Sequence, residues 1–127
     1  FHVIAEVVKA VSGAVASERK RLAATQPKLP KGRRTTKAAK AAARKKKRLE
    51  QKRVDLYTHR YLCVPHHLSH SERKRLWCIT RGLPQLRTLR ELMEQVYALC
   101  DRRCRTQTAL DKLAKLRYRL QRFQQLG

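Results

Sequence analysis

The segment PQLRTLRELMEQVYALC, residues 84–100, decides the class of fold. Its apolar side chains recur at intervals of three and four residues, a spacing that keeps them on one side of an α-helix. These side chains are Leu86, Leu89, Met93, Val96 and Cys100. The segment is therefore predicted to form an amphipathic helix whose apolar face packs against another part of the protein.

The same spacing returns after an interruption, RRCRTQT, at residues 102–108. The second stripe consists of Leu110, Leu113, Leu116, Leu120, Phe123 and Leu126. Two antiparallel helices joined by a short turn are the natural packing of such a pair. The alternative is a homodimer in which the helices from Leu89 to Leu126 form a coiled-coil seam, although the stripe covers fewer heptads than such seams usually need.

Residues 1–26 are predicted to form another amphipathic helix facing the core, with Gly13 inside it at a cost of about 1 kcal/mol relative to alanine. The β-branched start, HVI, could equally be the end of a strand, which the family resemblance described below would make the exit from a catalytic core. The apolar stripe consists of Ile4, Val7, Val8, Val11, Val15 and Leu22.

Residues 27–35 read as an exposed linker because prolines and a glycine break regular structure there. Thr35 or Thr36 can cap the next helix, predicted for residues 36–62. That helix is polar on all sides as far as Leu49, so its first half is expected to project and its second half to dock. The docking side chains are expected to be Val54, Leu56, Tyr57, Tyr61 and Leu62.

Residues 63–127 are predicted to form a helical bundle. Pro65 marks a break, and Ser69 with Glu72 makes a capping box that starts a short helix reaching about Ile79. Gly82 and Pro84 are expected to end that helix. The predicted fold class is all-α, with four to five helices that form an amphipathic bundle or hairpin and one projecting, highly basic helix.

The net charge of +23 is the strongest feature of the composition. Residues 28–53 carry 13 basic residues and one acidic residue. Like charges at this density repel one another, which strains the compact state unless a polyanion neutralises them. No run approaches the roughly 18 apolar residues of a membrane span, and Glu6 and Lys9 interrupt the only stretch that looks like a signal peptide. A polyanionic partner is therefore expected, and the family resemblance described below implies a location in the bacterial cytoplasm, in association with the nucleoid.

The basic run is predicted to contact DNA, since lysine and arginine side chains that neutralise phosphates release condensed counterions. The residues predicted to bind the DNA backbone are Arg33, Arg34, Lys37, Lys40, Arg44, Lys45, Lys46, Lys47, Arg48, Lys52 and Arg53. A solvated charged surface fits less well, because 13 basic residues against a single acidic one, Glu50, leave nearly all of the cations without a glutamate at i,i+4. An anionic membrane also fits less well, because no Trp, Phe or Leu face is available to insert. A localisation signal is a further alternative.

Four cysteines are interpreted as reduced and buried. Cys63 and His66 have a zinc-type spacing, but the second closely spaced pair of a structural site is missing, so no metal site is predicted. Asp55, Asp101 and Asp111 lie beside arginine or lysine in helical segments, as surface carboxylates do. The sequence shows no catalytic residues and no small-molecule site, and this chain alone is expected not to be catalytic.

Three stretches resemble a known family: FHVIAEVVKAV at residues 1–11, the segment from SERKRLWCITRGLPQLRTLRE to DKLAKLRYRL at residues 71–120, and QRFQQLG at residues 121–127. They resemble the helical region of bacterial insertion-sequence transposases of the DDE type, whose catalytic domain is RNase H-like. The resemblance implies DNA transposition and DNA recombination as the role of the parent protein.

The resemblance also implies that this chain is a fragment, beginning after the second catalytic aspartate and ending before the catalytic glutamate. His2 would then be the histidine of a Cys-x-x-His element, and the parent enzyme would use Mg²⁺. This chain itself contains no cofactor site on that interpretation. The alternative is a free-standing basic α-helical protein that binds nucleic acid, of the nucleoid or RNA-assembly type.

Overall fold

The computed structural model describes residues 2–29, 31–32, 36–101 and 105–126. Within these ranges the protein forms five α-helices and one short 3₁₀ helix and contains no strand, which confirms the all-α prediction. The elements are α1 His2–Ala24, α2 Lys37–Thr58, η1 Arg60–Cys63, α3 His70–Ile79, α4 Pro84–Asp101 and α5 Thr106–Leu126.

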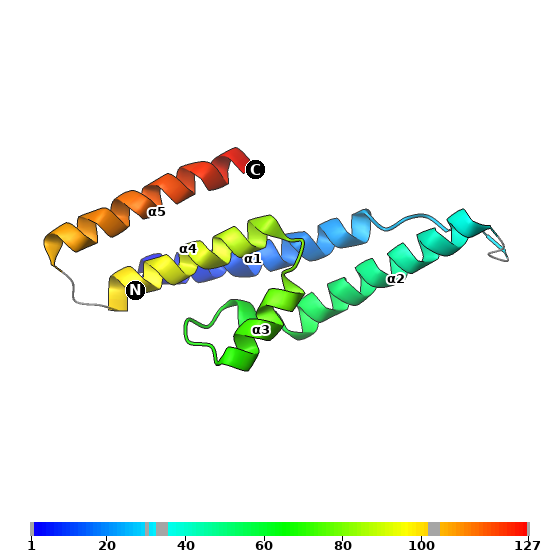
Figure 1. Ribbon diagram of the computed structural model, residues 1–127, viewed down its shortest axis with the longest axis horizontal. Coiled ribbons are helices and arrows are strands. Elements are labelled where there is room, and N and C mark those ends of the chain that lie inside the picture. Colours follow the sequence, from blue (N-terminus) through cyan, green and yellow to red (C-terminus); the bar gives the residue numbers. More distant parts are fainter. Residues whose placement is uncertain (1, 30, 33–35, 102–104, 127) are drawn as a thin grey trace.

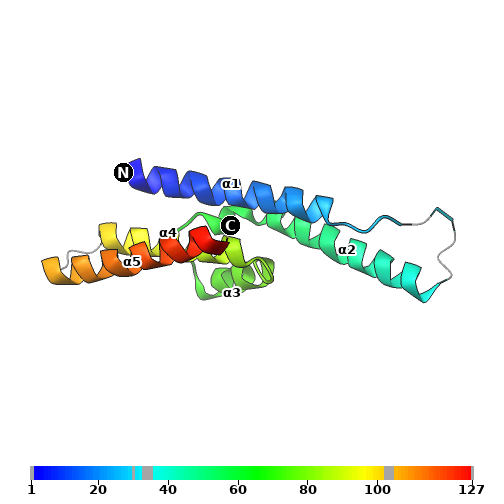
Figure 2. The ribbon, with the colours of Figure 1, turned by 90° about the horizontal axis from the view of Figure 1, so that it is seen from above.

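The helices form two antiparallel pairs, α1 with α2 and α4 with α5, and the two pairs contact each other through α1 and α4 (Figure 1). α1 and α2 run in opposite directions, and both α2 and α4 lie on the same side of α1 (Figure 2). α5 runs back along α4 as the outer layer, as the periodicity predicted (Figure 2). η1 and α3 fill the space where the end of α2 meets α4.

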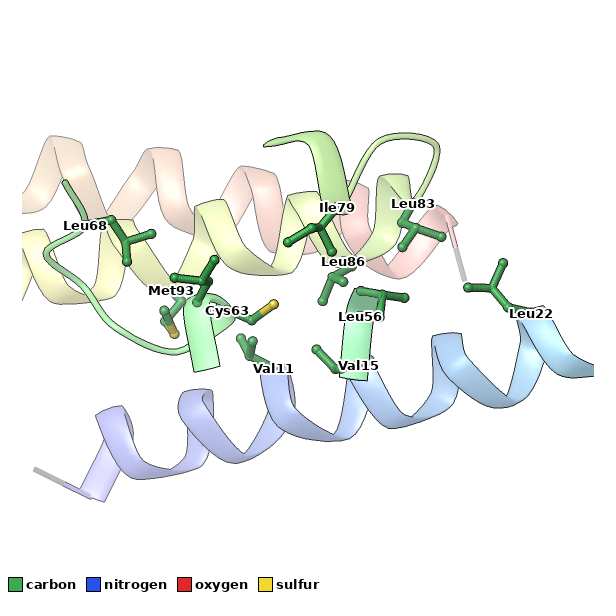
Figure 3. Packing of buried hydrophobic residues seen from close by; sticks show 11 residues of the cluster. Val11, Val15, Leu22, Leu56, Cys63, Leu68, Ile79, Leu83, Leu86 and Met93 are labelled. Carbon is green, nitrogen blue, oxygen red and sulfur yellow. The ribbon is translucent and has the colours of Figure 1, made fainter. Parts of the chain in front are cut away.

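The core lies where α1, the end of α2, η1, α3 and α4 meet, and Figure 3 shows its side chains converging from these elements. Each of these apolar side chains stabilises the fold by roughly 1.5–3 kcal/mol through burial. The buried cluster consists of Val11, Val15, Leu22, Leu56, Leu62, Cys63, Leu68, Ile79, Leu83, Leu86 and Met93. No described residue of α5 belongs to this cluster.

α1 begins at His2, so the segment HVI is helical and the strand alternative is wrong for these residues. Val11, Val15 and Leu22 are the buried part of its predicted stripe, at spacings of four and seven. Glu18 is also buried on this face, where its carboxylate pairs with the Arg21 guanidinium at 2.8 Å.

Local capping follows the sequence prediction. Thr36 precedes α2, and its hydroxyl accepts a hydrogen bond from the Ala39 amide at 3.1 Å. Ser69 and Glu72 form the predicted capping box of α3. Hydrogen bonds from the Ser69 backbone and side chain hold the pKa of Glu72 below its usual value, which stabilises the charged form at the helix start.

The turn after α3 follows the sequence prediction. Gly82 adopts a φ of +76°, a backbone conformation that favours glycine, and so turns the chain after α3 as expected. Pro84 is the first residue of α4, where the helix predicted for residues 84–100 begins. Proline suits this position because the first helical amide has no partner within the helix.

The docking face of α2 is narrower than predicted. Val54, Tyr57 and Tyr61 are exposed, which is a correction to the sequence interpretation. The buried seam instead passes through Leu56 and Cys63, with Leu49 packed against it, at a spacing of seven residues. The reason is that a helix touching one neighbour buries a narrow stripe, and the chain changes to a 3₁₀ helix from Arg60, which alters the phase.

The leucine stripe of α5 is only partly covered by α4. Leu116 and Phe123 are half-buried, whereas Leu110, Leu113 and Leu120 are exposed. The antiparallel hairpin of α4 and α5 is therefore as predicted. Three of the six apolar side chains of α5 that were expected to pack against α4 are exposed to solvent instead. A homodimer through these helices stays a prediction.

The narrow core can be tested by comparing two leucine truncations. Leu56→Ala should lower the free energy of unfolding by about 2–5 kcal/mol, because Leu56 is fully buried and its removal leaves a cavity. Leu113→Ala is the matched control, since its side chain is 50% exposed on α5, and it should cost less than about 1 kcal/mol. Urea unfolding followed by circular dichroism measures both, and equal losses would contradict this description of the core.

Candidate nucleic-acid interface

The first half of α2 projects beyond the end of α1. The Gln26 side chain, just after α1, donates a hydrogen bond to the Glu50 carboxylate in the middle of α2. The residues of α2 that precede Glu50 therefore extend past that point, and Figure 2 shows them reaching away from the other helices. This is the projecting basic helix that the sequence predicted.

The cations of this projecting segment face solvent. Within the described residues, none of the side chains from Lys37 to Arg48 forms an ion pair with a carboxylate. Lys46 is half-buried and the other cations are exposed. The exposed members are Lys37, Lys40, Arg44, Lys45, Lys47 and Arg48. Seven positive charges thus lie on about three turns of helix without an ion pair to a carboxylate.

The remaining predicted DNA-binding residues fall into three groups. Arg33 and Arg34 lie outside the described residues. Arg53 is paired within α2, since its guanidinium lies 2.6 Å from the Glu50 carboxylate. Hydrogen bonds from Arg53, and then from Gln26, hold the pKa of Glu50 below its usual value. Arg53 is therefore already neutralised in the free protein, whereas Lys52 belongs to a second cationic site.

That second site is a groove between α2 and the turn that joins α3 to α4. It is open to solvent and has a volume of about 610 Å³. One wall is α2, and the other is the end of α3 with the turn after it. The lining residues are Arg48, Leu49, Gln51, Lys52, Asp55, Cys78, Ile79, Arg81 and Gly82.

The turn is fastened to α2 by Lys52, whose ammonium group donates a hydrogen bond to the Arg81 carbonyl. Gly82 allows this approach, because the φ of +76° places the chain in a conformation that other residues rarely adopt. Asp55 also lines the groove, where its carboxylate accepts a hydrogen bond from Gln51 at 2.9 Å. The groove is cationic despite this carboxylate.

Burial, and then arginines from three helices and from the turn after α3, lower the pKa of Lys52. Burial lowers the pKa of the Lys52 ammonium, and the charges of Arg87, Arg48, Arg21 and Arg81 lower it further. We call Lys52 together with these four arginines the Lys52 cluster. Because the cluster disfavours the charged form of its own lysine, an anion in the groove would relieve the repulsion. Arg21 is the one member that also pairs with a carboxylate, that of Glu18.

Arg87 of α4 is held in place by Trp77 of α3. Its guanidinium carbon lies 3.6 Å from the centre of the Trp77 ring, and its Nη2 donates to the Trp77 carbonyl at 3.0 Å. Its Nε donates to the Thr80 hydroxyl at 3.3 Å. These contacts fix the orientation of Arg87, while the Trp77 ring itself is 61% exposed.

The cysteine and histidine residues are spread over separate environments. Cys63 is buried in the core, and burial raises the pKa of its thiol. Cys78 and Cys100 are exposed, which corrects the expectation of buried cysteines, and Cys104 lies outside the described residues. Cys78 is exposed because it lies on the groove side of α3 rather than on the core side with Ile79.

His66 fastens the loop before α3 to α4. Its ring stacks on Tyr97 at 4.6 Å, and its Nδ1 lies 2.8 Å from the Glu94 carboxylate. Arg90, buried beside it, pairs with the same carboxylate at 2.6 Å and donates to the Pro65 carbonyl. These contacts of His66 and Arg90 hold the loop before α3 against α4.

Within the described ranges, no three His, Cys, Asp or Glu side chains lie close enough together to hold a metal ion. Asp55 lies on α2 and Asp111 on α5, each accepting a hydrogen bond from a glutamine one turn earlier. His2, expected in a Cys-x-x-His element, is the first residue of α1 and is exposed. None of the helices in these ranges is both long and apolar enough to cross a membrane.

Comparisons with protein-family models, with curated proteins and with solved structures found no match to this chain. The function is therefore argued from its own residues. Sequence reasoning found the cations of α2 but missed Arg21, Arg81, Arg87 and Trp77. No sequence signal marks them as a group, because they come from three separate segments that meet only in the folded protein.

The cysteine environments predict a pattern of alkylation. Iodoacetamide should modify Cys78 and Cys100 in the folded protein, because both thiols are exposed. Cys63 should react only after unfolding in urea, because it is buried and the pKa of its thiol is raised. Peptide mass spectrometry with and without urea measures this, and rapid modification of Cys63 in the native protein would contradict the packing of η1.

If a phosphate of DNA binds beside the Lys52 cluster, the side chain of Lys52 is expected to take up a proton. The lowered pKa means that free Lys52 loses its charge below the usual lysine value of 10.5. A bound phosphate would raise that pKa again, so binding should take up protons in the alkaline range below 10.5, and affinity should fall as the pH rises there. Calorimetry of DNA binding in two buffers of different ionisation enthalpy measures the uptake. In the variant Lys52→Arg the side chain stays charged, so the part of the proton uptake that comes from Lys52 should disappear.

Proposed function

We propose that this chain is a DNA-binding helical region of a transposase of the insertion-sequence DDE type, and that it binds the phosphate backbone of DNA. The observation that carries the proposal is the projecting half of α2, where seven cations from Lys37 to Arg48 form no ion pair with a carboxylate of the described residues. A polyanion is the ligand that such a surface attracts most strongly.

Two physical features support backbone contact rather than a merely solvated helix. Like charges at i,i+4 destabilise a helix, so Lys40 with Arg44 and Arg44 with Arg48 oppose the structure that carries them. The helix is held by its Thr36 cap and by the packing of its second half, not by its charges. The projecting half of α2 is therefore helical despite the repulsion between its positive charges. A polyanion bound to it would reduce this repulsion.

The Lys52 cluster extends this surface toward α3 and α4. Arg48 belongs both to the projecting run and to the groove, so the two cationic surfaces are continuous along α2. A phosphate backbone lying along α2 would pass from the projecting half into the groove. Backbone contacts give orientation and affinity but no base information, so the terminal sequences of the element would be recognised elsewhere in the parent protein.

The assignment to a transposase rests on the resemblance of residues 1–11 and 71–127. On this proposal the catalytic acids and the Mg²⁺ that they bind belong to other parts of the parent protein. Reading the coding frame on both sides of the chain tests it, since aspartates should precede Phe1 and a glutamate should follow Gly127. A frame without them, together with a preference for structured RNA over duplex DNA, would favour a free-standing nucleoid or RNA-assembly protein.

Backbone binding by α2 predicts a specific salt dependence. The logarithm of the binding constant for duplex DNA should fall with the logarithm of salt concentration by about 0.9 per phosphate neutralised. The triple variant Arg44→Gln, Lys45→Gln and Lys47→Gln should make the slope shallower by about one unit for each contact removed. Fluorescence anisotropy of a labelled duplex at several salt concentrations measures the slope.

The matched control removes the same charge from α5 instead. Its substitutions are Lys112→Gln, Lys115→Gln and Arg122→Gln, on the helix farthest from the projecting half of α2 (Figure 1). This variant should retain most of the slope of the unmodified protein. An equal loss in both variants would mean that net charge alone, and not the surface of α2, determines binding.

A further inference from the structure

We infer that the exposed ring of Trp77 is a stacking site for an unpaired base, so that the protein binds single-stranded nucleic acid beside its phosphate-binding groove. The inference rests on the proposed backbone binding and adds the class of substrate. Aromatic rings next to a cationic groove are the two components that single-strand binding requires, since bases stack on the ring while phosphates follow the charges.

The exposure of Trp77 is the first observation. Trp77 is the only tryptophan in the sequence, and it is 61% exposed although α3 has a buried side that ends in Ile79. One face of its ring is covered by Arg87, whose guanidinium carbon lies 3.6 Å from the ring centre. Because Arg87 lies over one face, a stacked base would use the other face of the ring, and the 61% exposure leaves area for it.

The second observation is that the ring has a rigid support. Arg87 donates hydrogen bonds to the Trp77 carbonyl and to the Thr80 hydroxyl, so the guanidinium is fixed relative to α3. A side chain that is ordered before binding loses less conformational entropy when a ligand stacks on it. The Arg87 guanidinium against the Trp77 ring also places a positive charge directly beside the proposed stacking site.

The third observation is the position of the phosphate groove relative to the ring. Cys78, the next residue after Trp77, lines the groove together with Lys52 and Arg81. Arg87 contacts the Trp77 ring and does not line the groove, although, after burial, its positive charge helps to lower the pKa of Lys52, which does line it. A nucleotide whose phosphate lies in the groove thus has an aromatic face available next to it for its base.

A hollow with both apolar and charged walls adjoins the Trp77 ring. It has a volume of about 160 Å³, and its lining residues are Leu68, Arg73, Leu76, Trp77, Thr80, Arg87, Arg90, Glu91 and Glu94. Leu68 and Leu76 offer apolar contact to an uncharged base, while the charged groups of the lining are three arginines and two glutamates. In a duplex both faces of each base are already stacked, whereas a single strand offers unstacked bases, so the site discriminates in favour of single strands.

A purely structural interpretation is that Trp77 only holds Arg87 and thereby the turn between α3 and α4. That role needs one face of the ring and makes no use of the other. The two interpretations differ in what happens to the ring when a strand binds. Stacking of a base changes the environment of the exposed face, whereas phosphate binding alone leaves it in water.

The experiment uses the fluorescence of Trp77 in the complete 127-residue chain. Three probes are compared: a single strand of oligothymidine, a blunt duplex of the same length, and inorganic polyphosphate as a polyanion without bases. Binding of each is measured independently by the displacement of a labelled oligonucleotide. At saturation, oligothymidine should quench the tryptophan emission, while the duplex and polyphosphate should leave it nearly unchanged.

Substitutions test the same point through affinity. Trp77→Ala should weaken oligothymidine binding by about 5- to 100-fold, and duplex binding by no more than about twofold, whereas Trp77→Phe should retain most of the single-strand affinity. Tyr118→Ala is the matched control, because Tyr118 is 60% exposed on α5 away from the groove, and it should change neither affinity. Circular dichroism verifies that each variant is folded.

The outcomes separate this inference from the proposed function. Saturation by oligothymidine without a change in Trp77 emission, or equal quenching by polyphosphate, would overturn the stacking site while leaving backbone binding intact. A parallel loss of single-strand and duplex affinity in Trp77→Ala would do the same, because it would show that Trp77 acts only through Arg87. Failure of all three probes to bind would instead overturn the proposed function.

Discussion

The packing of α2 and α4 against one side of α1 is the constraint on which the rest of this structure depends. Val11, Val15 and Leu22 form a single seam on α1, and the other elements of the core converge on it. Because the seam ends at Leu22, the first half of α2 extends beyond α1 and contributes no residue to the buried core cluster. The same packing brings the end of α2 against the turn after α3, so that Lys52 meets Arg81.

This arrangement sets a small apolar core against a large electrostatic repulsion. Burial fastens the second half of α2 through Leu56, while the charges that would oppose folding are placed where solvent screens them or where they converge on one groove. A ligand that binds only the folded state stabilises it by mass action. A polyanion in the Lys52 groove would therefore couple nucleic-acid binding to the stability of the contact between α2 and the turn after α3.

Particular elements show how far the sequence could predict this site. The capping box of α3 and the helix from Lys37 follow from local rules, and both were predicted because their physics lies within a few consecutive residues. The exposure of Tyr57 was not predicted, because it depends on which neighbours α2 has, and Arg19 and Arg60 stack on that ring instead of an apolar surface. Cys78 was misjudged for the same reason.

The sequence by itself determined the helices, their order, the antiparallel pairing of α4 with α5 and the basic surface of α2, because periodicity, capping and charge are properties of contiguous segments. Only the tertiary structure decided that Arg21, Arg81 and Arg87 would gather around Lys52, and that one face of Trp77 would be covered by Arg87 while the ring stayed open to solvent. The physical reason is that distances between distant segments are set by how the apolar seams of α1, α2 and α4 interlock, and no local pattern records that geometry.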